Sequence, residues 1–470
     1  MRPPLSSRPF APIVALALIA ACALTGCSAS GSVPKGVQGT PGGSGVRDPL
    51  FPRLGNGGYD VQHYALTLDY EPRTGRLTGT AEITARATAD LSAFNLDLHA
   101  LRADRVTVDG LGSAANQAGD ELTVRPRKDV ARGKTFRTVV RYSGNPRTIT
   151  DSDGSEEGWL RTADGALAVG EPAGSMAWFP GNHHPSDKAT YAVTATVPEG
   201  LDVISNGELA GETTRAGRTT FRWKSARPMA SYLATLAIGA YDTKTSRTPT
   251  GLPVITAVDP SVADDSAALL AEIPKVMQWS TRRFGPYPYS SIGAIVVPDG
   301  EVGYALETQN RPVFPAEHFQ LDILVHEIAH HWYGNSVTPA DWRDMWLNEG
   351  FATYAEWLWA EDFDGVPAQQ NYEKAFEDES NWEFPPADPP SPARISSSPV
   401  YGRGAMVLHK LRQEVGDETF DKILKGWPAE HRHGNASTKD FTAYAEKTVG
   451  HRLDDLWRIW LYGEDRPARA

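Results

Sequence analysis

Three histidines and one glutamate lie within six positions of each other in the segment HEIAHHWYGN, residues 326–335. On a helix, His326 and His330 are one turn apart and point to the same side, so their imidazoles can bind one Zn²⁺ ion. Glu327 lies about 100° round the helix from His326, where it can flank a bound water as a general base without being a ligand. His331 lies about 140° from that face, and we interpret it as an ordinary, partly buried histidine.

Glu349 is the candidate for the third metal ligand. A catalytic zinc site takes three protein ligands and leaves one position open. Glu349 lies in WLNEGFATYAEW, nineteen positions after His330, and the turn between them is long enough to bring two helices side by side. A surface carboxylate is the alternative, but Glu349 has apolar neighbours such as Trp346 and Phe351, where an unpaired charge would be costly. We therefore predict one Zn²⁺ per chain, held by His326, His330 and Glu349.

The second half of the chain has the hydrophobic spacing of helices. Apolar residues recur three and four positions apart in the segments that carry the metal-ligand candidates. The segment SIGAIVVP is predicted to be a short buried strand, and a Pro/Ser-rich loop is predicted at 384–399. We predict helices at 264–285, 320–334, 347–363, 402–416 and 452–463.

The first half of the chain alternates apolar and polar residues with a period of two. In YALTLDY (64–70) the tyrosines and leucines all fall on one face, and turn signals such as SGNP and PEG separate such runs. This pattern predicts an antiparallel β domain of many strands. We place the boundary in TKTSRTPTGLP (243–253), which gives an N-terminal β domain at 48–245 and a second domain at 246–470.

The N-terminal residues 1–26 resemble the signal peptide of a bacterial lipoprotein. Arg2 and Arg8 precede an apolar run from Ala11 to Leu24, which is too short for a comfortable transmembrane helix. The run ends in LTGC, which is similar to a lipobox and implies cleavage before Cys27 and a lipid on its sulfur. A plain signal peptide with a chance cysteine is the alternative.

Residues 27–47 are rich in Gly, Ser and Pro, and we predict a flexible tether there. Cys22 lies in the removed segment and Cys27 would be acylated, so no disulfide is expected. The formal net charge of −12 argues against a nucleic-acid partner, whose phosphates attract a basic surface. We expect an exported monomer, anchored by lipid to the outer face of the cell membrane.

From about Asp48 onward the chain resembles the gluzincin aminopeptidases of the aminopeptidase N type, which include the leukotriene-hydrolase aminopeptidases. The family pattern is HExxH, eighteen residues and then Glu in an NEGFA context, as found here at His326, Glu327, His330 and Glu349. GYDVQHYALTLDY, LSAFNLDLHAL, FGPYPY, GAMVLHKL and WLYGEDRP also match. The resemblance implies a multidomain α and β protein, with an N-terminal antiparallel β domain followed by a thermolysin-like α+β zinc-peptidase domain.

The resemblance also implies a substrate-binding edge. The family has a Gly-Ala-Met-Glu-Asn segment whose glutamate binds the free amine of the substrate, and YALET places Glu307 at that position. Gly303 precedes the segment and Ala305 lies within it. Tyr304 replaces the first glycine and Thr308 replaces the asparagine, so the fit of the substrate backbone differs from the family pattern.

Two further roles follow from the resemblance, and one segment departs from it. Family members place a Gln or Glu of the β domain near the amine, and GEPAGSMAWFP offers Glu171. A tyrosine before a Lys/Arg-Gly-Ala segment stabilises the oxyanion, and VYGRGAMVL offers Tyr401. In FPGNHHPSDKATY, His183 and His184 replace an Asp-Glu pair of the family. They form either a second metal site or a structural loop; we favour the loop because adjacent histidines do not easily share an ion.

The predicted activity is that of a zinc aminopeptidase, which hydrolyses the first peptide bond of peptides with a free N-terminus. Glu327 and Tyr401 would be catalytic, and Glu307, Glu171, Gly303 and Ala305 would bind substrate. An endopeptidase with the same zinc is one alternative, although it would not require Glu307. A catalytically silent surface lipoprotein that binds a ligand is another, although such a protein would usually have lost one of the site residues, and none is missing.

Overall fold

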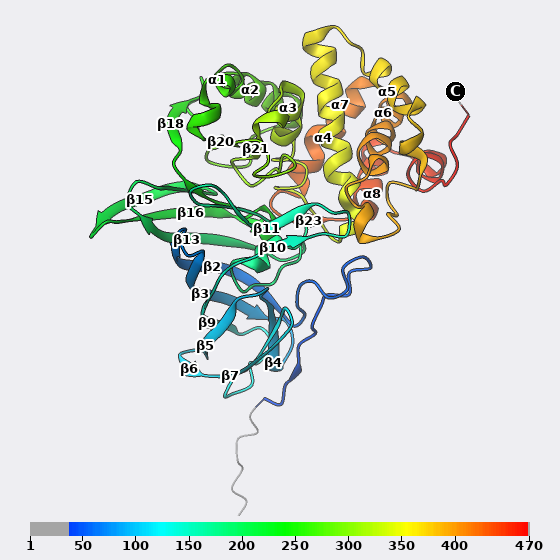
Figure 1. Cartoon of the computed structure of the whole chain (residues 1–470). Coiled ribbons are helices and arrows are strands. Elements are labelled where there is room, and N and C mark those ends of the chain that lie inside the picture. Colours follow the sequence, from blue (N-terminus) through cyan, green and yellow to red (C-terminus); the bar gives the residue numbers. More distant parts are fainter. Residues whose placement is uncertain (1–36, 469–470) are drawn as a thin grey trace, which may run out of the picture. The chain divides into compact units, whose positions relative to one another are not determined.

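The computed structural model describes residues 37–468, so the predicted signal peptide and Cys27 lie outside the described residues. Residues 37–468 belong to one compact unit (Figure 1). No helix among the described residues is both long enough and apolar enough to cross a membrane.

An eight-stranded sheet forms the larger part of the first half, in the order β15-β16-β13-β2-β3-β9-β5-β6 (Figure 1). Most neighbours are antiparallel as predicted, whereas β2 and β13 pair in parallel. A parallel pair requires a long crossover, and more than a hundred residues separate these two strands. The strands are β2 (Tyr59–Glu71), β3 (Arg76–Ala87), β5 (Arg102–Val108), β6 (Leu111–Gly112), β9 (Thr135–Gly144), β13 (Lys188–Pro198), β15 (Glu208–Arg215) and β16 (Arg218–Ala230).

The period-two pattern places the core side chains as predicted. In β2, Tyr64, Leu66, Leu68 and Tyr70 are each 1% exposed, while Thr67 and Asp69 between them are exposed. Successive side chains of a strand point to opposite faces, so one face of β2 enters the core. Two smaller sheets complete the first half, one of β1 (Thr40–Pro41), β4 (Leu91–Asp97), β7 (Ala114–Ala118) and β8 (Glu121–Arg125), the other of β10 (Thr148–Thr150), β11 (Glu156–Arg161), β12 (Ala166–Val169), β14 (Asp202–Ser205) and β17 (Leu236–Gly239).

The predicted flexible tether is wrong for its last residues, 37–47. Strand β1 pairs with β4, and the Gly39 N–H donates to a carboxylate oxygen of Asp129 at 2.7 Å. A Cβ atom on Gly39 would lie 2.4 Å from the backbone carbon of Leu91. Glycine here permits a close approach of two backbones, and composition alone does not distinguish that role from flexibility.

A four-stranded sheet, β18-β19-β20-β21, begins the second half. Its strands are β18 (Asp242–Arg247), β19 (Pro253–Val258), β20 (Ile292–Val297) and β21 (Val313–Pro315). Every residue of β20 is buried, in agreement with the prediction for SIGAIVVP. Strand β18 crosses the predicted domain boundary and pairs with β19 throughout. The division into domains remains a prediction, and β18 would belong to the second one.

Helices make up most of the remaining chain. The single helix predicted at 264–285 is wrong, because α1 ends at Leu270 and α2 begins at Ile273. Pro274 lies in the first turn of α2, where its missing N–H is tolerated but where it prevents one continuous helix. The helices are α1 (Ala263–Leu270), α2 (Ile273–Phe284), α3 (Leu321–Ala329), α4 (Trp346–Trp359), α5 (Ala368–Glu377), α6 (Gly404–Val415), α7 (Asp417–Glu430), α8 (Thr438–Val449) and the short α9 (Asp454–Leu456).

Helix α4 packs between α3 and α6 (Figure 1). Gly350 of α4 faces Gly404 of α6, and a Cβ atom on Gly350 would lie 2.8 Å from the Gly404 carbonyl carbon. The two glycines let the helix backbones come close together. This packing holds α4 and the metal-ligand candidate that it carries.

Candidate metal centre and active site

Helices α3 and α4 bring the three predicted metal ligands together. His326 Nε2 lies 3.2 Å from Glu349 Oε2, and His330 Nε2 lies 3.4 Å from the same oxygen. Three ligand atoms each about 2.0–2.1 Å from a tetrahedral Zn²⁺ would be about 3.3–3.4 Å apart, so the observed spacing fits such an ion. All three residues are buried.

The other nitrogen of each imidazole has its own partner. His326 Nδ1 lies 2.6 Å from Glu356 Oε1, and His330 Nδ1 lies 3.0 Å from the Tyr333 carbonyl oxygen. These contacts turn both Nε2 atoms toward Glu349. Sequence reasoning missed Glu356, although its position two turns after Glu349 on the same face of α4 was a usable signal. Carboxylates that accept from a ligating histidine orient the ring and strengthen metal binding.

The charges of the three ligands compensate one another. Burial alone would raise the pKa of Glu349, but the charges of His330 and His326 lower it well below the usual range. Burial alone would lower the pKa of His330, but the carboxylates of Glu349 and Glu307 raise it to about 9. A bound cation would take the place of these histidine protons, because ligating imidazoles are neutral.

Glu327 lies beside the metal-ligand candidates and is 5% exposed. Its Oε2 atom finds no hydrogen-bond partner within residues 37–468. Burial raises the pKa of Glu327 to about 8, with a further contribution from the charge of Glu307 that the two histidines oppose. A carboxylate with a pKa near neutrality is suited to accept and return a proton. Oxygen atoms of Glu307 and Glu327 also approach His330 closely enough to hold a cation, but that set omits His326.

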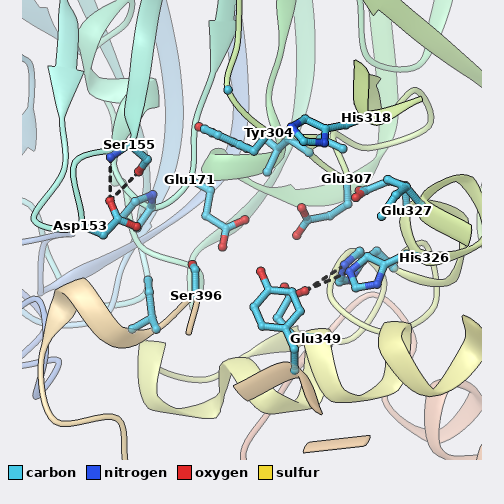
Figure 2. Close-up of a pocket in the computed structure, with 18 of the residues that line it drawn as sticks. Asp153, Ser155, Glu171, Tyr304, Glu307, His318, His326, Glu327, Glu349 and Ser396 are labelled. Carbon is cyan, nitrogen blue, oxygen red and sulfur yellow. Dashed lines mark hydrogen bonds and ion pairs between the residues drawn. The ribbon is translucent and has the colours of Figure 1, made fainter. Parts of the chain in front are cut away.

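One cavity of about 440 Å³ is lined by every predicted site residue among those that the structure describes. The list is Glu171, Gly303, Ala305, Glu307, His326, Glu327, His330, Glu349 and Tyr401. Figure 2 shows the carboxylates of Glu171 and Glu307 pointing into this cavity, beside His326 and Glu349. Residues of both halves of the chain therefore form one site.

Tyr401 lies in a short π-helical segment, Pro399–Arg403, directly before α6. Its ring stacks on the His326 imidazole, with ring centroids 6.0 Å apart and 16° between the planes. Burial and the nearby carboxylates, Glu349 first among them, raise the pKa of Tyr401 well above its usual value. The phenol therefore stays protonated at neutral pH and can donate a hydrogen bond into the cavity.

Glu307 is held by the loop that follows α3. The Asn335 side chain donates to the Glu307 carbonyl oxygen at 2.7 Å, and the Asn335 N–H donates to the His330 carbonyl oxygen at 2.9 Å. Glu307 is 3% exposed, and its Oε1 atom has no hydrogen-bond partner among the described residues. Burial raises the pKa of this carboxyl. A ligand cation that enters the cavity would therefore meet a carboxylate available for pairing.

Glu171 comes from the β half, in the turn after β12. Buried Glu157 holds this turn, because its carboxylate accepts from the Gly174 N–H at 2.6 Å and from the Ala173 N–H at 3.0 Å. Burial, and then the charge of Glu307, raise the pKa of Glu171 well above its usual value. Two neighbouring acids of this kind share a site most favourably when a cation lies between them.

Comparison with known proteins identifies the family. Residues 271–460 match the Peptidase family M1 domain, and residues 60–233 match the Peptidase M1 N-terminal domain. The solved structure of an M1 zinc metallopeptidase from Deinococcus radiodurans is 30% identical, covers 90% of this chain with 98% of its own, and superposes with a TM-score of 0.84. This chain belongs to peptidase family M1. The predicted family and fold class are confirmed.

Curated M1 relatives are longer. Aminopeptidase M1 of Arabidopsis thaliana is 27% identical over 327 residues, which are 64% of this chain and 37% of the relative. Aminopeptidase N of Streptomyces lividans is 27% identical over 313 residues, which are 60% of this chain and 36% of the relative. The chain thus spans little more than a third of the length of these two relatives, whereas it spans nearly all of the solved Deinococcus radiodurans structure.

The remaining histidines of this M1 protein lie outside the metal centre. His331 is fully buried rather than partly buried, and its Nδ1 atom lies 2.9 Å from the Tyr287 hydroxyl. Burial and the charge of His330 lower its pKa to about 3. His183 and His184 contact other groups of the protein: His183 Nε2 lies near the Phe179 carbonyl oxygen, and His184 contacts Ser186 and Asp48.

Tyr304 and Thr308, the two residues around Glu307 that differ from the family pattern, each make a hydrogen bond within the protein. The Tyr304 hydroxyl donates to the Glu156 carbonyl oxygen at 3.2 Å, so this side chain reaches across to the β half. The Thr308 hydroxyl donates to the Arg311 carbonyl oxygen at 2.5 Å, within its own turn. Tyr304 and Thr308 thus make contacts within the protein, and Glu307 between them keeps its place in the cavity.

Proposed function

We propose that this protein is a zinc-dependent aminopeptidase, which removes the first residue from peptides with a free N-terminus. The observation that carries the proposal is the meeting, in one cavity, of the ligand set His326, His330 and Glu349 with two carboxylates from different halves of the chain, Glu171 and Glu307. Solved structures of a glutamate-to-alanine mutant of an M1 zinc metallopeptidase are described as bound to L-arginine, to L-tryptophan or to a Tyr-Ser-Ala substrate. These ligands differ in side chain and share an α-amino group, which supports recognition of the amine.

His326, His330 and Glu349 would hold the Zn²⁺, which when bound supplies Lewis-acid activation of water and of the scissile carbonyl. Glu327 takes the proton of the attacking water and passes it to the leaving amine. Tyr401 donates a hydrogen bond to the carbonyl oxygen as negative charge develops there. Each of these side chains lines the cavity, and the Glu327 Oε2 atom has no hydrogen-bond partner among the described residues, which leaves it available to a water molecule.

The two carboxylates favour exopeptidase over endopeptidase activity. A substrate ammonium that enters a partly desolvated cavity requires an anion, or its burial is unfavourable. Glu171 and Glu307 supply that anion and would hold the first peptide bond beside Glu327. An endopeptidase would have an uncharged stretch of peptide at this position, which leaves the buried carboxylates uncompensated.

The test compares aminoacyl-p-nitroanilides with their N-acetylated forms, with and without a zinc chelator. We expect turnover of the free amines alone, lost with chelator and restored by Zn²⁺. Glu307→Gln should lower turnover of free amines about 10²-fold, the cost of a misplaced substrate, with zinc content unchanged. The matched control is Glu317→Gln, a carboxylate near the same edge that does not line the cavity. Equal cleavage of acetylated substrates would establish an endopeptidase, and no turnover by zinc-loaded protein would favour a binding protein.

We further propose that the protein is exported and carries a lipid on Cys27, which anchors a monomer at the outer face of the cell membrane. The support is the LTGC segment after an apolar run that two arginines precede. Cys27→Ala should abolish lipid labelling and move the protein out of the membrane fraction. A Cys22→Ala variant is the control and should behave as wild type. Unchanged lipid labelling of Cys27→Ala would contradict the proposal, and light scattering of detergent-solubilised protein tests the monomer.

A further inference from the structure

The cavity carries more negative charge than the proposed reaction uses. Seven carboxylates and three histidines line it, and no lysine or arginine occurs among the described residues of its lining. Five of the seven have a place in the site: Glu349 and Glu356 at the metal, Glu327 beside it, and Glu171 and Glu307 at the amine. Asp151 and Asp153 are left without a role.

Asp151 and Asp153 lie in the turn between β10 and β11. One carboxylate oxygen of Asp153 accepts from the Ser155 N–H at 2.9 Å and from the Ser155 hydroxyl at 2.7 Å, which fixes the turn. Figure 2 shows Asp153 and Ser155 on the far side of Glu171 from His326. The cavity therefore continues past the amine-binding carboxylates and ends against this turn.

The environment of Asp151 favours a cation nearby. Burial and the charge of Asp153 raise the pKa of Asp151 to about 6. The neighbouring Glu157 is fully buried, already accepts the N–H groups of Ala173 and Gly174, and shares a side-chain hydrogen bond with Asp151. No lysine or arginine lines the cavity, so a positive charge from a ligand would relieve the repulsion between Asp151 and Asp153.

A second observation, an unpartnered carboxylate oxygen in the same cavity, favours a ligand that carries a positive charge. Glu307 is 3% exposed and points into it, and its Oε1 atom has no partner in the part of the chain that the structure describes (Figure 2). A buried carboxylate oxygen without a donor is costly unless a ligand supplies one. Glu307 and the two aspartates therefore line one ligand-binding space, with the free amine at one end.

The geometry of a peptide's first residue indicates which group occupies each end of the cavity. Its Cα atom carries the amine, the carbonyl carbon and the side chain. On the proposed function, the amine pairs with Glu171 and Glu307 while the carbonyl lies beside Glu327. The side chain can then enter the rest of the cavity. The lining there includes Asp151, Asp153 and Ser396 together with Tyr304, His318, Ile323 and Ile395.

We propose that Asp151 and Asp153 form an acidic pocket for the side chain of the first residue, and that the enzyme prefers peptides that begin with arginine or lysine. The guanidinium or ammonium group would pair with the two aspartates at the β10–β11 turn. This inference rests on the proposed aminopeptidase function and adds its substrate class.

The test compares arginine-p-nitroanilide with citrulline-p-nitroanilide, which has nearly the same shape without the charge, and uses the leucine substrate as a reference. We expect kcat/KM to favour arginine over citrulline about 10- to 100-fold, the factor of a charge-assisted hydrogen bond. Asp153→Asn and Asp151→Asn should each lower this ratio about tenfold and leave the leucine rate nearly unchanged. Glu156→Gln is the matched control, since it removes a charge from the adjoining strand without lining the cavity.

Each outcome decides between the two claims. Turnover of all three substrates with equal kcat/KM for arginine and citrulline would overturn the acidic pocket and leave the aminopeptidase function in place. A preference for arginine that neither Asp variant reduces would overturn the assignment to these residues. Loss of folding in Asp151→Asn, whose carboxyl adjoins Glu157, leaves the decision to Asp153→Asn. No turnover of any free-amine substrate would overturn both claims.

Discussion

Two pairs of histidines in this protein use the same side chain in opposite ways. His326 and His330 turn their Nε2 atoms toward one oxygen of Glu349, at 3.2 and 3.4 Å. His183 and His184 turn away from each other: His183 Nε2 lies 3.0 Å from the Phe179 carbonyl oxygen, and His184 Nε2 lies 3.1 Å from an Asp48 oxygen. Spacing on the backbone explains the difference, because residues one helical turn apart share a face and adjacent residues do not.

The pKa values of His183 and His330 also differ, because the two imidazoles have different neighbours. Burial lowers the pKa of the His183 imidazole to about 4, because the ring contact with the Phe179 carbonyl oxygen offsets burial only in part. The Asp97 carboxylate accepts from the His183 backbone N–H and not from the ring. His330 is equally buried, yet Glu349 and Glu307 raise its pKa to about 9. His184 also contacts a buried carboxylate, that of Asp48. Burial, residue type and a neighbouring anion therefore do not distinguish the two uses of histidine, whereas converging geometry does.

The largest effect, on zinc content and activity, is expected when one of the two histidines that face Glu349 is removed. His330→Ala should lose nearly all of the roughly one zinc per chain and, with it, peptidase activity. His184→Ala is the matched control and should keep both, because its side chain contacts Asp48 and Ser186. Metal analysis of the purified proteins measures the difference. Zinc loss from His184→Ala would instead make the second pair part of a metal site.

The next prediction concerns Glu327, which lies beside His326 and would act as the general base without binding the metal. Glu327→Gln should retain zinc and lower kcat about 10²- to 10⁴-fold, the usual cost of removing a general base. Parallel measurements of kcat and zinc content separate the two roles. If zinc were lost together with activity, the alternative set of Glu307, Glu327 and His330 would be the ligands.

The pH dependence of stability tests His183, one of the two histidines that do not face each other. The folded-state pKa of His183 is about 4, below the usual 6.5, so the unfolded chain binds more protons between these values. The free energy of unfolding should therefore fall as pH drops from about 6.5 to about 4, by about 3 kcal/mol from this histidine. His183→Gln removes the titrating group, and the difference between the two urea-unfolding curves across this range measures it. A constant difference would mean that His183 does not titrate as described.

The smallest effect is expected from Glu356, which orients one ligand. Glu356→Gln leaves a side chain of the same size but a weaker acceptor for the His326 Nδ1–H. Zinc affinity, measured by competition with a chelator, should fall about 10- to 100-fold, as for comparable carboxylate partners of zinc-binding histidines. Unchanged affinity would show that the 2.6 Å contact does not support the metal site.

The sequence-based predictions failed where a local pattern had two physical explanations. The glycines of residues 37–47 indicated flexibility, whereas Gly39 is there because β4 passes close to it. The apolar spacing of 264–285 indicated one helix, whereas Pro274 separates two. Glu356 was missed although it follows Glu349 by two helical turns, and its contact with His326 shows its use.

The sequence by itself determined what depends on short-range geometry. Helical spacing sets the common direction of His326 and His330, and alternation along β2 sets which of its faces is buried. Only the tertiary structure decided which distant side chains meet. Glu171, Glu307 and Asp153 reach one cavity from separate turns of the two halves. The physical reason is that the backbone positions residues within a few turns or strand repeats, while the relative placement of sheets and helices depends on the packing of the whole core.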